Sequence, residues 1–222
     1  AIEIARTPPA GPVSVEIPID IQKLMIAHEE PNFQKLQTPT PSAELLDELA
    51  RRLGKAQRPI LWLGGGARHA TRAVARLADM GFGVVTSTQG RGILAENHPM
   101  VLGSFNSVPS SEEFYQTCDA MLVVGSHLRG NETLGYRLKL PKPLYHIDVD
   151  EDAECRNYLC DLFICGDAEL ALDGLVDRLT DNLFVDPKFA NDLSTVRQAG
   201  EINLRKTLGP YETVLDGLIQ AA

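Results

Sequence analysis

The chain has 222 residues, 44% of them hydrophobic, and a formal net charge of -9. A chain of this length buries roughly 70% of the surface that its unfolded form exposes, which is enough for a packed core. The negative charge argues against nucleic acid and anionic membranes as partners, because both attract basic surfaces. No apolar run approaches the roughly 18 residues of a membrane span, and no secretory signal opens the chain. The cysteines, which suggest no disulfide scaffold, favour a cytoplasmic location.

The first part of the chain has the pattern of a strand followed by a linker. Apolar and polar residues alternate within residues 11–22, GPVSVEIPIDIQ, which predicts a short half-buried strand. Residues 23–41 have no such period and contain three prolines, which is typical of a linker. A strand without a partner nearby in the sequence indicates the tail of another domain.

From residue 42 onward, apolar runs alternate with amphipathic segments. Ser42 is placed to cap a helix that ends at Gly54. Continuous apolar runs predict strands at residues 59–63, 83–87, 120–125, 144–149 and 161–165. Helices are predicted at residues 68–80, 110–118, 151–158, from 168 onward, and twice within 182–222. Continuous apolar strands are covered on both faces, so the pattern predicts an α/β fold with a doubly wound, mostly parallel sheet.

The turn after the first of these strands raises the main question about function. Gly64, Gly65 and Gly66 follow the strand, but His69 stands where a dinucleotide-binding fingerprint has its third glycine. The turn is therefore either an anion-binding cradle at a helix start or only a sharp corner. Arg68 is predicted in the first turn of the next helix, where a bound anion would offset its unfavourable interaction with the helix dipole.

Polar groups also follow the other predicted strands, at the edge where open α/β sheets bind ligands. They lie in the stretches Thr86-Ser87-Thr88-Gln89-Gly90, Gly125-Ser126-His127 and Asp148-Val149-Asp150. An acidic residue after a strand can hold a ribose hydroxyl, but Asp150 can equally cap the helix that follows it.

The four cysteines are Cys118, Cys155, Cys160 and Cys165. The last three are spaced by four residues, whereas zinc sites usually pair cysteines two to four residues apart and return with a second pair. We therefore expect small buried hydrophobic residues, with no metal site, no disulfide scaffold and a reducing compartment.

Several stretches, in order along the chain, resemble the central domain of thiamine-diphosphate-dependent enzymes of the acetolactate synthase type. They are RPILWLGGGA, VVTSTQGRGILAENHP, LVVGS, YHIDVD and ICGDAELAL. The resemblance implies a six-stranded central α/β domain at residues 37–181. Residues 1–36 then resemble the tail of the pyrimidine-binding domain with a linker, and residues 182–222 a linker with the first helix of the diphosphate-binding domain.

The resemblance implies a non-catalytic piece of a larger transferase or lyase that acts on 2-oxo acids. In that family thiamine diphosphate supplies the chemistry. Its activating glutamate lies in the pyrimidine-binding domain, and a G-D-G…N motif in the third domain holds magnesium and diphosphate. Gly166-Asp167-Ala168 is not that motif. The parent is expected to be a homodimer or homotetramer, because family active sites lie between subunits.

The family's central domain holds FAD in acetolactate synthases and an adenine nucleotide or nothing in other members. The positions that the resemblance implies for FAD or ADP are Gly64, Gly65, Gly66, Thr86, Ser87, Thr88, Asp148, Asp150, Gly166 and Asp167. Where acetolactate synthases have G-A-R, this chain has Gly125-Ser126-His127, and the nearest arginine is Arg129. The alternatives are a stand-alone nucleotide-binding regulatory module and a Rossmann-type oxidoreductase, which His69 disfavours.

Overall fold

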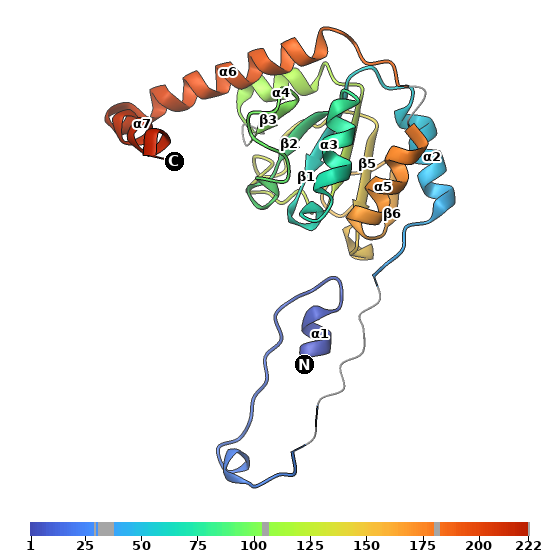
Figure 1. Cartoon of the computed structure of the whole chain (residues 1–222), viewed down its shortest axis with the longest axis vertical. Coiled ribbons are helices and arrows are strands. Elements are labelled where there is room, and N and C mark those ends of the chain that lie inside the picture. The colour runs from blue at the N-terminus through green and yellow to red at the C-terminus, as the bar shows by residue number, and fades with distance from the viewer. Residues whose placement is uncertain (29, 31–37, 104–106, 180–182, 222) are drawn as a thin grey trace.

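The computed structural model describes residues 1–28, 30, 38–103, 107–179 and 183–221. Within these residues six parallel strands form one sheet, in the order β3-β2-β1-β4-β5-β6 (Figure 1). The strands are β1 (Pro59–Leu63), β2 (Gly83–Thr86), β3 (Val101–Gly103), β4 (Ala120–Val124), β5 (Leu144–Asp148) and β6 (Leu162–Cys165).

Helices lie on both faces of this sheet (Figure 1). Helices α2 (Ala43–Leu53) and α3 (Thr71–Asp79) pack against α5 (Ala168–Leu179). Helix α4 (Pro109–Tyr115) packs against the long helix α6 (Phe189–Leu208). The predicted doubly wound α/β fold is confirmed, and every strand pair is parallel.

The core consists of the strands and the inward faces of these helices. Every residue of β1 and β4 is buried, as expected for central strands covered on both sides. The predicted caps also form. Ser42 Oγ accepts a hydrogen bond from Leu45 N at 3.4 Å, and Asp167 Oδ1 accepts one from Leu170 N at 3.0 Å.

The strand predicted within residues 11–22 is wrong. Residues 11–18 have no secondary structure, and Val15 and Ile17 are exposed to 62% and 54%. Alternation describes a strand only where a neighbour supplies hydrogen bonds, and none of the described strands pairs with this segment.

Two other predictions differ in detail. The sequence analysis missed β3, a strand of three residues at the edge of the sheet; there Arg197 Nη1 of α6 donates to Val101 O at 3.2 Å. The helix predicted at residues 151–158 is only a 3-10 turn, Glu151–Ala153.

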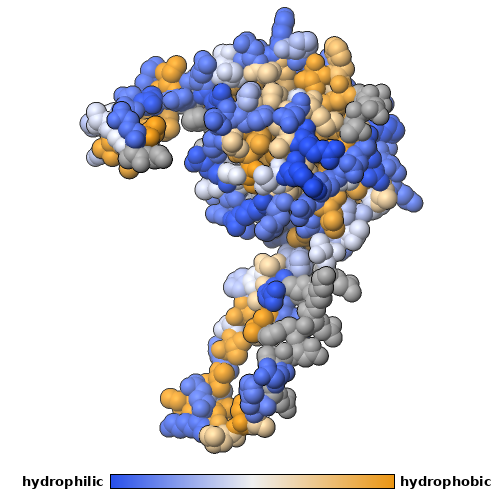
Figure 2. All heavy atoms as spheres, viewed as in Figure 1, coloured by the Kyte–Doolittle hydropathy of each residue, from blue (hydrophilic) through white to orange (hydrophobic). Residues whose placement is uncertain are grey.

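The two ends of the chain differ in how they contact the core. The N-terminal residues, with helix α1 (Ile2–Arg6), form a tail on which apolar side chains are exposed (Figure 2). At the other end Phe189 and Leu193 are fully buried, whereas α7 (Glu212–Ala221) exposes its apolar residues.

The predicted boundaries at 36/37 and 181/182 lie outside the described residues. Among the described helices, none combines the length and the apolar character that a membrane crossing requires.

Candidate functional site

The order of the strands creates a switch point between β1 and β4. From β1 the chain continues outward through β2 and β3, then crosses to the other side of β1 and continues through β4, β5 and β6. The loops that follow β1 and β4 therefore leave toward opposite faces. Between these two loops, at the carboxyl ends of the strands, lies a crevice. Open α/β sheets bind their ligands in this position.

The glycine turn after β1 is packed directly against the turn after β4. Gly64 N donates to Val124 O at 2.9 Å, and Gly66 N donates to Gly125 O at 3.0 Å. A Cβ atom at Gly64 would lie 2.1 Å from Gly125 O, and one at Gly66 would lie 2.8 Å from Gly125 Cα. These two glycines are therefore required by the close approach of two backbones, and their N–H groups are already used by β4 and its turn.

Arg68 does not lie in the first turn of a helix, as the sequence analysis predicted. Residues Gly65–Ala67 form a 3-10 turn, and α3 begins only at Thr71 with Ala70 as its N-cap. The argument from the helix dipole is therefore wrong for Arg68. Its guanidinium instead donates to Gln89 Oε1 at 2.8 Å, across the mouth of the crevice.

A pocket of about 690 Å³ lies at the switch point. This volume falls within the roughly 300–1,000 Å³ of typical small-molecule sites. The residues predicted for the site that line it are Gly64, Gly65, Gly66, Arg68, Ser87, Gly125, Arg129, Asp148 and Gly166, together with His127. Three further lining residues, Gln89, Ser126 and Val149, belong to the stretches that the sequence analysis placed at the ends of the strands. The other four, Pro9, Ala10, Glu132 and Ala168, were not predicted. Ala168 directly follows the predicted Asp167, but no sequence signal singled out Glu132 or the tail residues.

Four predicted residues lie beside the pocket instead of lining it. Thr86 is buried, and its hydroxyl has no hydrogen-bond partner among the described residues. Thr88 is exposed on a 3-10 turn. Asp150 and Asp167 act as caps: Asp150 Oδ1 accepts from Asp152 N, and Asp167 Oδ1 accepts from the first turn of α5.

Two histidines face the carboxylates at the end of β5. His127 Nε2 lies 3.5 Å from Asp150 Oδ2 and 3.9 Å from Asp148 Oδ1, and His146 Nε2 lies 3.8 Å from Asp148 Oδ2. Burial alone would raise the pKa of Asp148. The nearby His146 imidazole, the hydrogen bond from Asp150 N and the more distant His127 outweigh that effect, so the pKa is lowered. Asp148 is therefore an ionised acceptor in the pocket wall at neutral pH.

The charges that line the pocket are mixed. Arg68 and Arg129 supply two cations, and Glu132 and Asp148 supply two anions. This arrangement suits a ligand with an anionic end near the arginines and hydroxyl donors near Asp148. Within the described part of the chain, no group of three or more His, Cys, Asp or Glu side chains is placed to hold a metal ion.

The chain matches the family described as "Thiamine pyrophosphate enzyme, central domain" over residues 46–175. It is 30% identical over 213 residues to a probable 2-ketoarginine decarboxylase of Pseudomonas aeruginosa, with 95% of this chain and 37% of that protein covered. It is 27% identical over 211 residues to a probable acetolactate synthase large subunit of Methanococcus aeolicus, with 89% of this chain and 35% of that protein covered. The chain thus spans about a third of the length of these curated relatives.

Solved structures of similar fold come from larger proteins as well. One from Mycobacterium smegmatis, described as a thiamin diphosphate-dependent enzyme, superposes with a TM-score of 0.65 at 26% identity, covering 82% of this chain and 36% of that one. Benzoylformate decarboxylase of Polynucleobacter necessarius superposes with a TM-score of 0.63 at 18% identity, with the same coverage, and supports the fold alone.

Proposed function

Because the chain belongs to the thiamine pyrophosphate enzyme family and corresponds to its central domain, we propose that it is part of a larger 2-oxo acid decarboxylase or carboligase resembling acetolactate synthase. In this proposal the flanking pyrimidine- and diphosphate-binding domains are its partners, and the parent forms a homodimer or homotetramer. The chain itself contributes a scaffold and a nucleotide pocket, not the reacting groups.

The family implies thiamine diphosphate, with magnesium, as the cofactor that supplies the chemistry as an electron sink. We propose that its site lies in the flanking domains, because the family's activating glutamate and its G-D-G…N motif belong to those domains. The similar stretch Gly166-Asp167-Ala168 does not match that motif, and Asp167 instead caps α5. We assign no catalytic step to the residues of this chain.

The pocket at the switch point is the observation that carries the proposed nucleotide binding. Its volume suits a ligand that contains an adenine nucleotide, such as FAD or ADP. Arg68 and Arg129 are the proposed phosphate contacts, because charge-assisted hydrogen bonds from guanidinium to phosphate are strong. Asp148, held ionised, is the proposed acceptor for a ribose hydroxyl. Because the N–H groups of Gly64 and Gly66 are engaged by β4 and its turn, phosphate binding depends on side chains more than on the glycine turn.

The test is calorimetric titration of ADP and of FAD into the purified chain. We expect saturable binding of at least one, and roughly tenfold weaker binding in Arg68→Gln, since a hydrogen bond to a charged group contributes about 1.5–3 kcal/mol. Arg72→Gln is the matched control. Arg72 lies on α3, is 79% exposed and pairs with Asp173 of α5 at 3.1 Å, away from the pocket lining.

Two outcomes would contradict these proposals separately. Absence of heat with both ADP and FAD would leave a purely structural domain and remove the nucleotide proposal. Turnover of pyruvate, or tight binding of thiamine diphosphate, by this chain alone would overturn the assignment of the chemistry to other domains.

A further inference from the structure

Two cysteines meet in the loop between β5 and β6, next to the pocket. Cys155 follows the 3-10 turn that Asp150 caps, and Cys160 lies two residues before the start of β6. Cys155 has a φ of 50°, a left-handed conformation that is uncommon for a residue other than glycine. Both side chains are half-buried, so small solutes reach them.

The two sulfur atoms are in direct contact. Cys155 Sγ lies 3.0 Å from Cys160 Sγ, which is only about 1 Å longer than a disulfide bond of about 2.05 Å. The backbone holds this arrangement, because Cys160 N donates to Cys155 Sγ at 3.3 Å. By contrast Cys118 is buried in the segment between α4 and β4, and the thiol of Cys165 lies near Val149 O at 3.8 Å.

We propose that Cys155 and Cys160 are a reversible dithiol–disulfide site. The oxidant is a low-molecular-weight disulfide such as oxidised glutathione. The Cys155 thiolate attacks it, forms a mixed disulfide and releases one glutathione thiolate. The Cys160 thiolate then attacks Cys155 Sγ, which forms the intramolecular bond and releases the second glutathione. The chain loses two electrons and two protons, and the oxidant leaves as two molecules of reduced glutathione.

The ring that this bond closes touches the pocket. Within it, Asn157 Nδ2 donates to His127 O at 2.7 Å, and Tyr158 OH donates to Leu138 O at 3.2 Å. His127 is part of the pocket lining. The disulfide would therefore fasten the loop that supports one wall of the pocket.

Formation of the disulfide is expected to depend on pH. Burial, and then the contact with Cys155, raise the pKa of Cys160 to about 11. This thiol is protonated at neutral pH, and only the thiolate reacts. The rate of ring closure should therefore increase as the pH rises from neutral toward the pKa of Cys160.

The test is to incubate the native chain with oxidised glutathione and to map the cysteines by mass spectrometry without reduction. We expect the mass of the chain to fall by two hydrogen atoms, a peptide link between Cys155 and Cys160, and no retained glutathione on either residue. In Cys160→Ser the mixed disulfide should instead persist on Cys155. Cys165→Ser is the matched control and should close the ring as the unchanged chain does. A thiol reductant should restore the starting mass in each case.

The same reaction in urea separates native geometry from mere closeness in sequence. When each rate is divided by the fraction of Cys160 present as thiolate, closure in the native chain should be at least about tenfold faster than in the unfolded chain, because the folded loop holds the sulfurs together. An equal or slower native rate overturns the proposal. So does stable glutathione on Cys155 of the unchanged chain, or a bond that involves Cys118 or Cys165. Far-ultraviolet circular dichroism checks that Cys160→Ser is folded. If it is not, the test is repeated with Cys155→Ser.

Discussion

Gly125 shows how a single residue sets the geometry of the candidate site. Its φ is 58°, and a Cβ atom added to it would lie 2.6 Å from Gly66 Cα. The sequence analysis placed Gly125 in the site, but it could not predict that the glycine turns after β1 and β4 occupy each other's space. That contact depends on the order of the strands, which residue spacing does not reveal.

The first prediction concerns Gly125→Ala. We expect a loss of about 3 kcal/mol in the free energy of unfolding, because a left-handed conformation costs roughly 1–2 kcal/mol and overpacking a further 1–3 kcal/mol. Gly135→Ala is the control: Gly135 has a φ of 65°, but a Cβ atom there would meet nothing within 4 Å. It should lose only about 1 kcal/mol in urea denaturation. Equal losses in the two variants would contradict the role of the turn contact.

The second prediction concerns Asp148 and acid stability. Its pKa is lowered in the folded chain because, although burial acts in the opposite direction, the His146 imidazole and the N–H of Asp150 favour the carboxylate. The stability that this contributes is fully present above the ordinary carboxyl pKa of about 3.9, and is lost as the pH falls through the lowered pKa. Denaturant midpoints between about pH 5 and pH 2 should therefore fall less steeply in Asp148→Asn than in the unchanged chain. If the denaturant midpoints of both proteins fall equally steeply, Asp148 does not contribute to acid stability.

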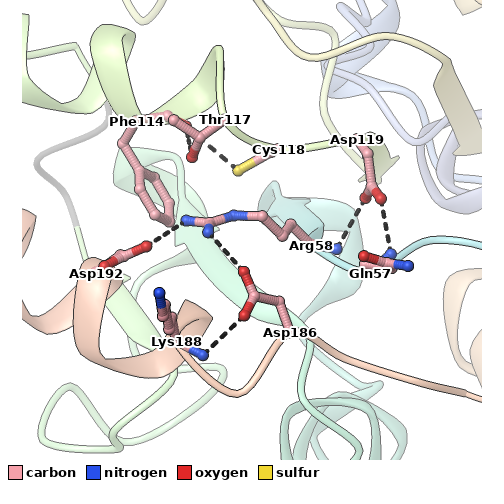
Figure 3. A network of polar contacts seen from close by, with 9 residues as sticks. All are labelled: Gln57, Arg58, Phe114, Thr117, Cys118, Asp119, Asp186, Lys188 and Asp192. Carbon is pink, nitrogen blue, oxygen red and sulfur yellow. Dashed lines mark hydrogen bonds and ion pairs between the residues drawn. The ribbon is translucent and has the colours of Figure 1, made fainter.

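At the scale of elements, Arg58 joins the start of β1 to the start of α6 (Figure 3). Its guanidinium donates to Asp186 Oδ2 at 2.9 Å and to Asp192 Oδ2 at 2.7 Å. The same group lies 5.1 Å from the centre of the Phe189 ring, and its side chain is only 17% exposed. Figure 3 also shows Asp119 accepting hydrogen bonds from the backbone N–H groups of Gln57 and Arg58.

The third prediction is that Arg58→Met loosens α6 from the core. Removing one partner of a largely buried ion pair costs about 3–5 kcal/mol, and we expect the lower end because Asp192 remains 41% exposed. Amide exchange at residues 189–193 should accelerate together with the loss of stability. Arg72→Met, which breaks the exposed pair with Asp173, should change stability by less than about 1 kcal/mol. Unchanged exchange in α6 of the Arg58 variant would refute its anchoring role.

The elements that the sequence predicted well are those whose own residues determine them. Strands β1, β2, β4, β5 and β6 are apolar runs that any covered sheet requires, and Ser42 and Asp167 are local caps. The misses depend on partners far away in the sequence. The segment 11–18 pairs with none of the strands in the described part of the chain, and β3 is stabilised by Arg197 of α6, nearly a hundred positions later. Helix α3 begins at Thr71 and not at residue 68 as predicted, because the glycine turn continues as a 3-10 turn.

At the scale of the whole molecule, the chain combines a covered α/β unit with ends of a different character. The central strands bury all their side chains, whereas Ile19, Met25 and Ile26 of the tail are 75%, 97% and 84% exposed. Each such side chain would contribute roughly 1.5–3 kcal/mol if it were buried. The N-terminal tail therefore gains little free energy from contact with the rest of the described chain.

The last prediction is that hydrogen exchange divides the chain in the same way. Backbone amides of residues 11–28, which lack strand pairing, should exchange close to the rate of an unfolded peptide. Amides of β1 and β4 should exchange only through opening with a free energy near that of global unfolding, because both strands are paired on each side. Residues 209–221 are mostly exposed, but Glu212 and Asp216 accept hydrogen bonds from Arg205 of α6, so their amides should fall between these two limits. The first turns of α6 should behave as the core does because Phe189 and Leu193 are buried. The comparison needs only the intact chain, with the exchange of each peptide followed by mass spectrometry. Tail amides as well protected as those of β1 would show that the segment 11–28 is held by contacts absent from this fold, and would contradict the division.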